Sequence, residues 1–135
     1  MSKQINIGDK LPDLDIPITA LQIVSGAIAT QDFENVHHDK AAAQAAGTPD
    51  IFMNILTTNG LVGRYLTDWA GAEARLKRIK LRLGAPNFPG DTMTLSGKVS
   101  ANENDIVEIE FKGKNGLGNH VTGVASLTFA DRLGV

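Results

Sequence analysis

Apolar residues in the middle of the chain recur at helical spacing. Over residues 54–70 they fall close to a period of about 3.6, at Ile55, Leu56, Leu61, Val62, Tyr65, Leu66 and Trp69. Asn54 suits the N-cap of this helix, and Gly71 suits its end. Gly60 and Gly63 lie inside it, and each destabilises a helix by about 1 kcal/mol relative to alanine. We therefore expect the helix to approach a surrounding sheet closely at these two glycines.

The back half of the chain alternates between apolar and polar residues instead. Residues 93–99, 106–112 and 121–129 each place their apolar side chains on one face, as strands do. Turn-forming stretches rich in Pro, Asn, Asp and Gly separate them, which predicts antiparallel hairpins. A long apolar helix followed by such strands predicts an α+β fold in which the sheet curls around the helix.

The front third of the chain is mixed. Residues 14–18 alternate like a strand, and Pro17 confines this strand to a sheet edge or places the proline at a strand end. Residues 19–30 have helical spacing behind a capping Thr19, although Gly26 weakens that prediction. The alanine-rich run 41–46 predicts a short helix that stops at Gly47.

Composition restricts the class of protein. A length of 135 residues suits one domain spanning residues 1–135, and a net charge of −2 argues against a nucleic-acid module. Cysteine is absent, which excludes disulfides and thiolate metal sites. No apolar run approaches the roughly 18 residues of a membrane span, and the first ten residues lack the apolar segment of a signal peptide. We expect a cytoplasmic protein that binds neither membranes nor nucleic acids.

The residues most suited to catalysis are Asp32 and His37, which are separated by five positions. A carboxylate and an imidazole at this spacing can hold one water molecule, take a proton from it and return a proton to carbon. Asp32 also suits the simpler role of capping a turn. Among the neighbours, Asp39 is expected to cap the alanine-rich helix, His38 to be structural or at the surface, and Glu34 to lie at the surface or the rim of the site.

The same region carries a resemblance to a known family. In the MaoC-like or (R)-specific enoyl-CoA hydratase family, an Asp-Tyr/Phe…His-x-Asp segment precedes a small-residue helix, and a Pro-Gly-Asp-Thr turn leads into a strand. The matching residues here are Asp32-Phe33, Val36-His37, Asp39, Gln44-Ala45-Ala46-Gly47 and Phe88-Pro89-Gly90-Asp91-Thr92-Met93. The resemblance extends from about residue 32 to residue 129 and implies a hot-dog fold, with an antiparallel sheet wrapped around a central helix.

Two departures from the family pattern are informative. Glu34-Asn35 stands where the family has Asn-Pro, and Met53-Asn54 stands where it has His-Gly at the entry to the central helix. The chain resembles the small MaoC-like subunits of bacterial steroid side-chain degradation. That resemblance implies an enoyl-CoA hydratase, a lyase that adds water to a bulky steroid enoyl-CoA. It also implies either a homodimer or a heterotetramer with a larger MaoC-like subunit.

The resemblance further implies roles for individual residues. Asp32 and His37 would be catalytic, with the choice of formal base left open, and the backbone N–H of Asn54 would bind the oxyanion. The basic run before the back-half strands offers two interpretations. Arg78, Lys80 and Arg82 share one face of a strand that is expected to start after Arg75 and Lys77; they either contact coenzyme A phosphates or form a solvated sheet face.

Other chemistry is not expected. Coenzyme A would be part of the substrate, so no separate cofactor is expected, and His37-His38-Asp39 has no third ligand at a metal-binding spacing. His120 is expected to be solvated in a polar turn. Two alternatives to a hydratase remain. The loss of the family's His-Gly at Met53-Asn54 favours a non-catalytic partner subunit. A thioesterase is the other alternative, and the presence of the Asp32…His37 segment argues against it.

Overall fold

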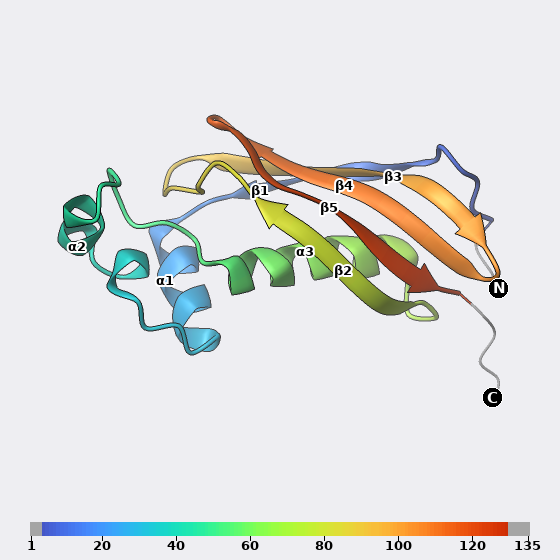
Figure 1. The fold of residues 1–135 in the computed structure, drawn as a ribbon, viewed down its shortest axis with the longest axis horizontal. Helices are drawn as coiled ribbons and strands as arrows, with labels where there is room; N and C mark the ends of the chain where they lie inside the picture. The colour runs from blue at the N-terminus through green and yellow to red at the C-terminus, as the bar shows by residue number, and fades with distance from the viewer. Residues whose placement is uncertain (1–3, 130–135) are drawn as a thin grey trace.

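A computed structural model describes residues 4–129 and shows one antiparallel sheet over a long helix (Figure 1). The strand order is β1-β3-β4-β5-β2. The strands are β1 (Lys10–Pro17), β2 (Arg75–Leu83), β3 (Thr92–Glu103), β4 (Ile106–Asn115) and β5 (Gly118–Thr128). The helix α3 (Ile55–Ala70) lies against one face of the sheet, so the predicted α+β hot-dog arrangement is confirmed.

The remaining helices gather beyond one end of the sheet, near the start of α3 (Figure 1). They are α1 (Ala20–Ala29), the 3₁₀ turn η1 (Asn35–His37) and α2 (Lys40–Ala45). Thr19 caps α1, and Asp39 caps α2 by accepting from the backbone N–H groups of Ala41 and Ala42, as predicted. Gly47 follows α2 with φ +103°, the left-handed conformation that ends many helices.

Helix α3 forms where its apolar period predicts. Asn54 caps it through a hydrogen bond that its side chain accepts from the Thr57 backbone N–H, and Gly71 ends it. The buried side chains of α3 are Thr58, Val62, Tyr65, Leu66 and Ala70. They pack on the inner face of the sheet, where Val107, Ile109 and Phe111 of β4 alternate with exposed residues. The buried side of α3 and the inward-facing apolar side chains of β4 thus form part of one core.

Strand β2 starts earlier than predicted. It begins at Arg75, and its register with β5 shifts between Leu76 and Arg78. The expectation that Arg75 and Lys77 lie before the strand is therefore wrong. A bulge absorbs the extra residue, so pairing continues although the alternation is broken. β1 and β2 are the two edge strands, which confirms the edge position expected from Pro17.

The expected reason for two helix glycines is also wrong. A Cβ on Gly60 would meet no atom within 4 Å, and one on Gly63 would only touch Leu76 Cδ2 at 4.0 Å. The close approach instead occurs at Gly26 in α1, where a Cβ would overlap Thr57 Oγ1 and lie 3.0 Å from Thr57 Cγ2. The glycine that weakened the prediction of α1 is thus the one that lets α1 cross α3.

A second close approach lies within the sheet. Leu11, Gly97, Phe111, Gly123 and Leu81 are direct neighbours across all five strands. A Cβ on Gly123 would lie 2.6 Å from Phe111 Cζ and 3.0 Å from Leu81 Cα. The Phe111 ring therefore fills the space beside a glycine, an arrangement that allows a sheet to curve.

Candidate active site

The structure brings Asp32 and His37 together at the end of the molecule where α1, η1 and α3 meet. Asp32 follows the end of α1, and His37 closes η1. His37 Nε2 lies 3.5 Å from Asp32 Oδ2, and the two side chains are 9% and 24% exposed. An imidazole and a carboxylate therefore share one partly open site, as their spacing predicts.

The orientation of His37 is fixed by a carbonyl group. Its Nδ1 lies 2.6 Å from the backbone oxygen of Phe52. Because a carbonyl oxygen only accepts, Nδ1 carries the hydrogen. In the neutral ring the lone pair is then on Nε2, the nitrogen that faces Asp32. The ring of Phe52 packs edge-on against the imidazole, with centroids 5.0 Å apart.

Hydrogen bonds hold the Asp32 carboxylate from two sides. Asp32 Oδ2 accepts from the Asn54 side-chain amide at 3.0 Å, and Oδ1 accepts from the Glu34 backbone N–H at 3.2 Å. The Asn54 bond, then the Glu34 bond, and more weakly the charges of His37 and His38, lower the pKa of Asp32. Partial burial opposes them without reversing the direction. The site therefore favours an ionised Asp32.

Asn54 joins this site to the start of α3. Its backbone has φ −80° and ψ 162°, an extended conformation open to any residue, so a glycine is not required where the family has His-Gly. The side chain is 2% exposed and contacts Asp32 directly. The residue was expected to cap α3 and to act in the site through its backbone N–H, and the sequence contained no sign of this contact across 22 positions.

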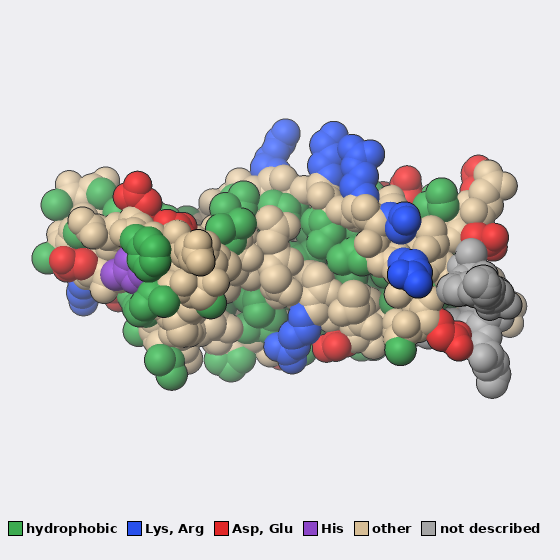
Figure 2. Space-filling view, turned by 90° about the horizontal axis from the view of Figure 1, so that it is seen from below, with side chains coloured by type: hydrophobic (Ala, Val, Ile, Leu, Met, Phe, Trp, Pro, Cys, Tyr) green, Lys and Arg blue, Asp and Glu red, His purple; other side chains and the backbone are tan. Residues whose placement is uncertain are grey.

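Other residues near the pair have supporting positions. His38 Nε2 donates to the Asp32 backbone oxygen at 2.9 Å, which makes this histidine structural. Glu34 is exposed, as expected for a residue at the surface. Large apolar side chains are exposed on the segments that carry the site; they are Leu21 and Ile28 of α1, Phe33, and Ile55 and Leu56 of α3. Figure 2 shows such side chains next to a histidine at the left end of the molecule.

His120 is buried rather than solvated, which contradicts the expectation from sequence. Its exposure is 2%, its Nδ1 donates to the Ala85 backbone oxygen at 2.7 Å, and its Nε2 lies 2.8 Å from Thr58 Oγ1. Burial lowers the pKa of His120 more than the Ala85 bond raises it. The ring is therefore neutral and accepts from the Thr58 hydroxyl, which ties β5 to the first turn of α3.

The basic residues of β2 lie on an edge strand of the sheet. Arg78, Lys80 and Arg82 are exposed and pair with residues on the outward face of β5. Figure 2 shows Lys and Arg side chains projecting along one long edge of the molecule. A solvated sheet face and a phosphate contact are both compatible with this placement.

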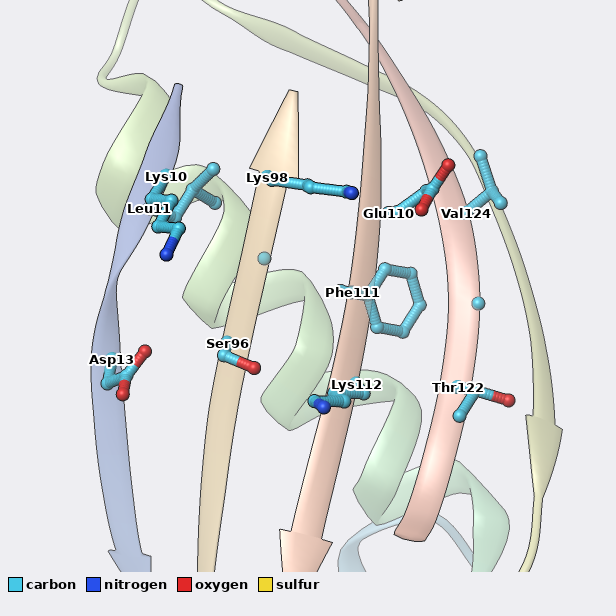
Figure 3. A pocket seen from close by; sticks show the side chains of 12 residues that line it. Lys10, Leu11, Asp13, Ser96, Lys98, Glu110, Phe111, Lys112, Thr122 and Val124 are labelled. Carbon is cyan, nitrogen blue, oxygen red and sulfur yellow. The ribbon is translucent and has the colours of Figure 1, made fainter. Parts of the chain in front are cut away.

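The outer face of the sheet has a shallow hollow of about 670 Å³ that the sequence did not predict (Figure 3). It crosses β1, β3, β4 and β5, with α3 behind them. Its charged lining residues are Lys10, Asp13, Lys98, Glu110 and Lys112. Neither Asp32 nor His37 contributes to it, so it is separate from the candidate active site.

Residues 4–129 contain neither a cluster of metal-binding side chains nor a membrane-spanning helix. No group of three or more His, Asp or Glu side chains is arranged to hold a metal ion in this part of the chain. No helix among the same residues has the length and apolar character needed to cross a bilayer.

Comparison with known proteins assigns the family. The model of the MaoC-like domain matches residues 3–120. The chain belongs to the MaoC-like family. It is 48% identical, over 125 residues, to the 3-oxo-4,17-pregnadiene-20-carboxyl-CoA hydratase beta subunit of Mycobacterium tuberculosis. That alignment covers 93% of this MaoC-like chain and 97% of the relative.

Solved structures agree with this assignment. A chain of the ChsH1–ChsH2 complex from Mycobacterium tuberculosis superposes with a TM-score of 0.92 and 46% identity, covering 94% of this chain and all (100%) of that one. The (R)-hydratase from A. caviae involved in PHA biosynthesis superposes with a TM-score of 0.83 and 21% identity, covering 96% and 100% of the two chains. The second likeness, at this low identity, supports the fold alone.

Proposed function

We propose that this MaoC-like protein is the small subunit of an enoyl-CoA hydratase that acts on a bulky, steroid-like acyl group. The observation that carries the proposal is the pairing of His37 Nε2 with Asp32 Oδ2 in one partly open site. The relative at 48% identity supports it, because that protein is the beta subunit of a hydratase for a pregnadiene carboxyl-CoA. Coenzyme A enters as part of the substrate, and the chemistry needs no further cofactor.

The reaction needs a base, a group that stabilises the enolate and a proton donor. A water molecule held between Asp32 and His37 attacks C3 of the enoyl thioester as it loses a proton to this pair. The electrons of the C2–C3 double bond move towards the thioester oxygen, which the backbone N–H of Asn54 stabilises at the start of α3. Return of one proton to C2 completes the addition of water.

The surface around the site fits a large apolar substrate. Phe33 is 68% exposed next to Asp32, and Ile55 is 47% exposed next to Asn54. Exposed apolar side chains that adjoin catalytic groups favour a hydrophobic acyl chain over a short polar one. The ring system carried by that chain is proposed from the relative's substrate.

A larger MaoC-like subunit is the proposed partner. The related chain of known structure comes from a complex of two proteins, ChsH1 and ChsH2. In this chain, apolar residues of α3 and β2 remain partly exposed; they are Leu61, Leu76, Ile79, Leu81 and Leu83. Figure 2, a view from the side on which α3 lies, shows apolar side chains along the middle of that face. We further propose that Arg78, Lys80 and Arg82 contact the phosphates of coenzyme A and that the complex is cytoplasmic.

A hydration assay tests the function. Steroid and straight-chain enoyl-CoA substrates are supplied to the chain alone and to the chain with a candidate larger subunit. Asp32→Asn and His37→Ala should each lower turnover by about 100-fold or more. Glu34→Gln is the matched control, because it alters an exposed acid in the same segment and should retain full turnover.

Two results would overturn parts of the proposal. Full turnover by Asp32→Asn or His37→Ala, with circular dichroism showing a folded protein, would exclude the pair as the catalytic groups. Efficient hydration of short linear substrates by the chain alone would exclude the steroid-like substrate class.

A further inference from the structure

The Asn54 side chain uses all of its hydrogen-bonding capacity. Its Oδ1 accepts from the Thr57 backbone N–H at 3.0 Å and from the Thr57 hydroxyl at 2.6 Å. Its Nδ2 donates to Thr30 Oγ1 at 3.0 Å and to Asp32 Oδ2 at 3.0 Å. An amide has two acceptor and two donor positions, so this buried side chain is fully satisfied.

The direction of the Asn54 amide follows from its partners. A backbone N–H can only donate, so the atom that faces Thr57 N is the oxygen. The NH₂ group must then face Asp32. An amide donor stabilises a carboxylate and cannot accept from a carboxylic acid, so this contact favours the ionised form of Asp32.

The remaining surroundings of Asp32 contain few charges. Helix α1 has no charged residue, and the only charged residues of α3 are Arg64 and Asp68, more than two turns beyond Asn54. The titratable groups that face Asp32 are His37 and His38, and the neighbouring Glu34 contacts it through its backbone N–H. Asn54 is thus the neutral group on α3 that holds the Asp32 carboxylate and favours its ionised form.

We propose that Asn54 is a positioning residue that holds the ionised Asp32 carboxylate in a fixed orientation beside His37, which leaves His37 as the group that carries the proton. This inference rests on the proposed hydratase function and deepens it, because it assigns the formal base. Nδ1 of His37 already carries a hydrogen bonded to Phe52 O, which leaves Nε2 to accept. Asp32 orients the water and stabilises the imidazolium as it forms.

The proton balance is closed within the pair. As the water oxygen bonds to C3, one water proton moves to His37 Nε2 and the double-bond electrons move towards the thioester oxygen. The resulting imidazolium then gives its Nε2 proton to C2, which restores the carbonyl and the neutral ring. Asp32 gains and loses no proton, and one water molecule has been added.

The first test measures protonation directly and does not depend on turnover. The carboxyl carbon of Asp32 is titrated by NMR in the wild-type chain and in Asn54→Ser, which keeps a capping side chain that is too short to clamp Asp32. The pKa of Asp32 should rise in Asn54→Ser towards the ordinary value of about 3.9. Asn54→Asp also keeps a cap but places a second carboxylate beside Asp32, so one of the two should titrate well above that value. Asn59→Ser, the same change further along α3, should leave the pKa of Asp32 unchanged.

The second test uses the hydratase assay on the assembled enzyme. In the wild type, the acid limb of kcat/KM should follow the NMR titration of His37 and not that of Asp32. Asn54→Ser should lower kcat by about tenfold or more, with KM nearly unchanged, because Asp32 stays ionised at neutral pH but loses its fixed orientation. In Asn54→Asp the acid limb should move to higher pH, which loss of a helix cap alone would not cause.

The outcomes separate the two proposals. An unchanged pKa of Asp32 in Asn54→Ser, or an acid limb that follows Asp32, overturns the role of Asn54 while the hydratase function stands. A wild-type enzyme without hydration of any enoyl-CoA overturns the function, and the assignment of His37 as proton carrier falls with it. Both proposals are supported if Asn54→Ser raises the pKa of Asp32 and lowers kcat, and if Asn54→Asp moves the acid limb of kcat/KM to higher pH.

Discussion

Two glycines in neighbouring helices should respond in opposite ways to the same substitution. Gly60 lies in the interior of the 16-residue helix α3, and a Cβ there would meet nothing within 4 Å. Gly60→Ala should therefore gain the helix propensity difference of about 1 kcal/mol. For a chain of this length, that gain corresponds to a rise in Tm of about 3–4 °C.

Gly26→Ala should lower stability instead. Its Cβ would overlap the Thr57 hydroxyl and lie 3.2 Å from Thr57 Cβ. Thr57 is β-branched on a helix, so its χ1 has few alternatives, and its hydroxyl is held by Asn54 Oδ1 at 2.6 Å. Overpacking costs about 1–3 kcal/mol, and the strained hydrogen bond adds about 1 kcal/mol. After the gain of about 1 kcal/mol from helix propensity, the net loss should be about 1–3 kcal/mol.

Thermal and urea unfolding of both variants provide the measurement. Thr57→Ala removes the atoms that a Cβ at position 26 would meet, so the double variant Gly26→Ala/Thr57→Ala should show a coupling energy that restores part of the loss. A rise in Tm for Gly26→Ala equal to that for Gly60→Ala would refute the reasoning. It would show that α1 and α3 separate without penalty.

Two further predictions concern charge. Burial lowers the pKa of His120, so the unfolded chain binds a proton at this histidine more readily than the folded chain does. The contribution of the neutral ring to the free energy of unfolding is therefore complete above about pH 6.5. Below that pH it declines, by at most about 1.4 kcal/mol per pH unit. His120→Gln should flatten the dependence of the free energy of unfolding on pH between 4 and 7, and an unchanged slope would exclude His120 as its source. Lys80→Glu and Arg82→Glu should raise KM for enoyl-CoA with little effect on kcat, and should weaken the salt dependence of KM; an unchanged KM at low salt would assign these residues to the solvated sheet face.

Periodicity was sufficient to predict the parts of the fold that depend on local sequence. The bounds of α3, its caps at Asn54 and Gly71 and the alternating burial of β4 all follow from residues close in the chain. The start of β2 could not be predicted from local sequence, because a bulge between Leu76 and Arg78 keeps the strands paired while it breaks the apolar–polar alternation. Pairing with β5 supplied the information that the β2 sequence alone lacks.

In the candidate site, too, contacts within one segment could be predicted from sequence, and contacts between distant segments could not. The spacing of Asp32 and His37 within one segment was visible, and the structure brings them to 3.5 Å. The burial of His120 was not visible, because its partner Thr58 is 62 positions away. The clamp from Asn54 to Asp32 was equally hidden, since it depends on how α1 and α3 cross at Gly26. Contacts made by tertiary packing orient the side chains of the site, whereas the sequence pattern identified only Asp32 and His37 as its members.

The pairing of Phe111 with Gly123 has a consequence for how this protein can vary. The ring and the bare backbone share one volume, with Cζ only 2.6 Å from where a Cβ on the glycine would sit. A Cβ on Gly123 would also overlap the backbone oxygen of Lys80 on β2, which no substitution at position 111 moves. A smaller residue at Phe111 would leave the ring's volume empty without making room for a side chain at position 123. A library that randomises both positions should therefore return glycine at 123 in nearly every folded clone, with large apolar residues at 111.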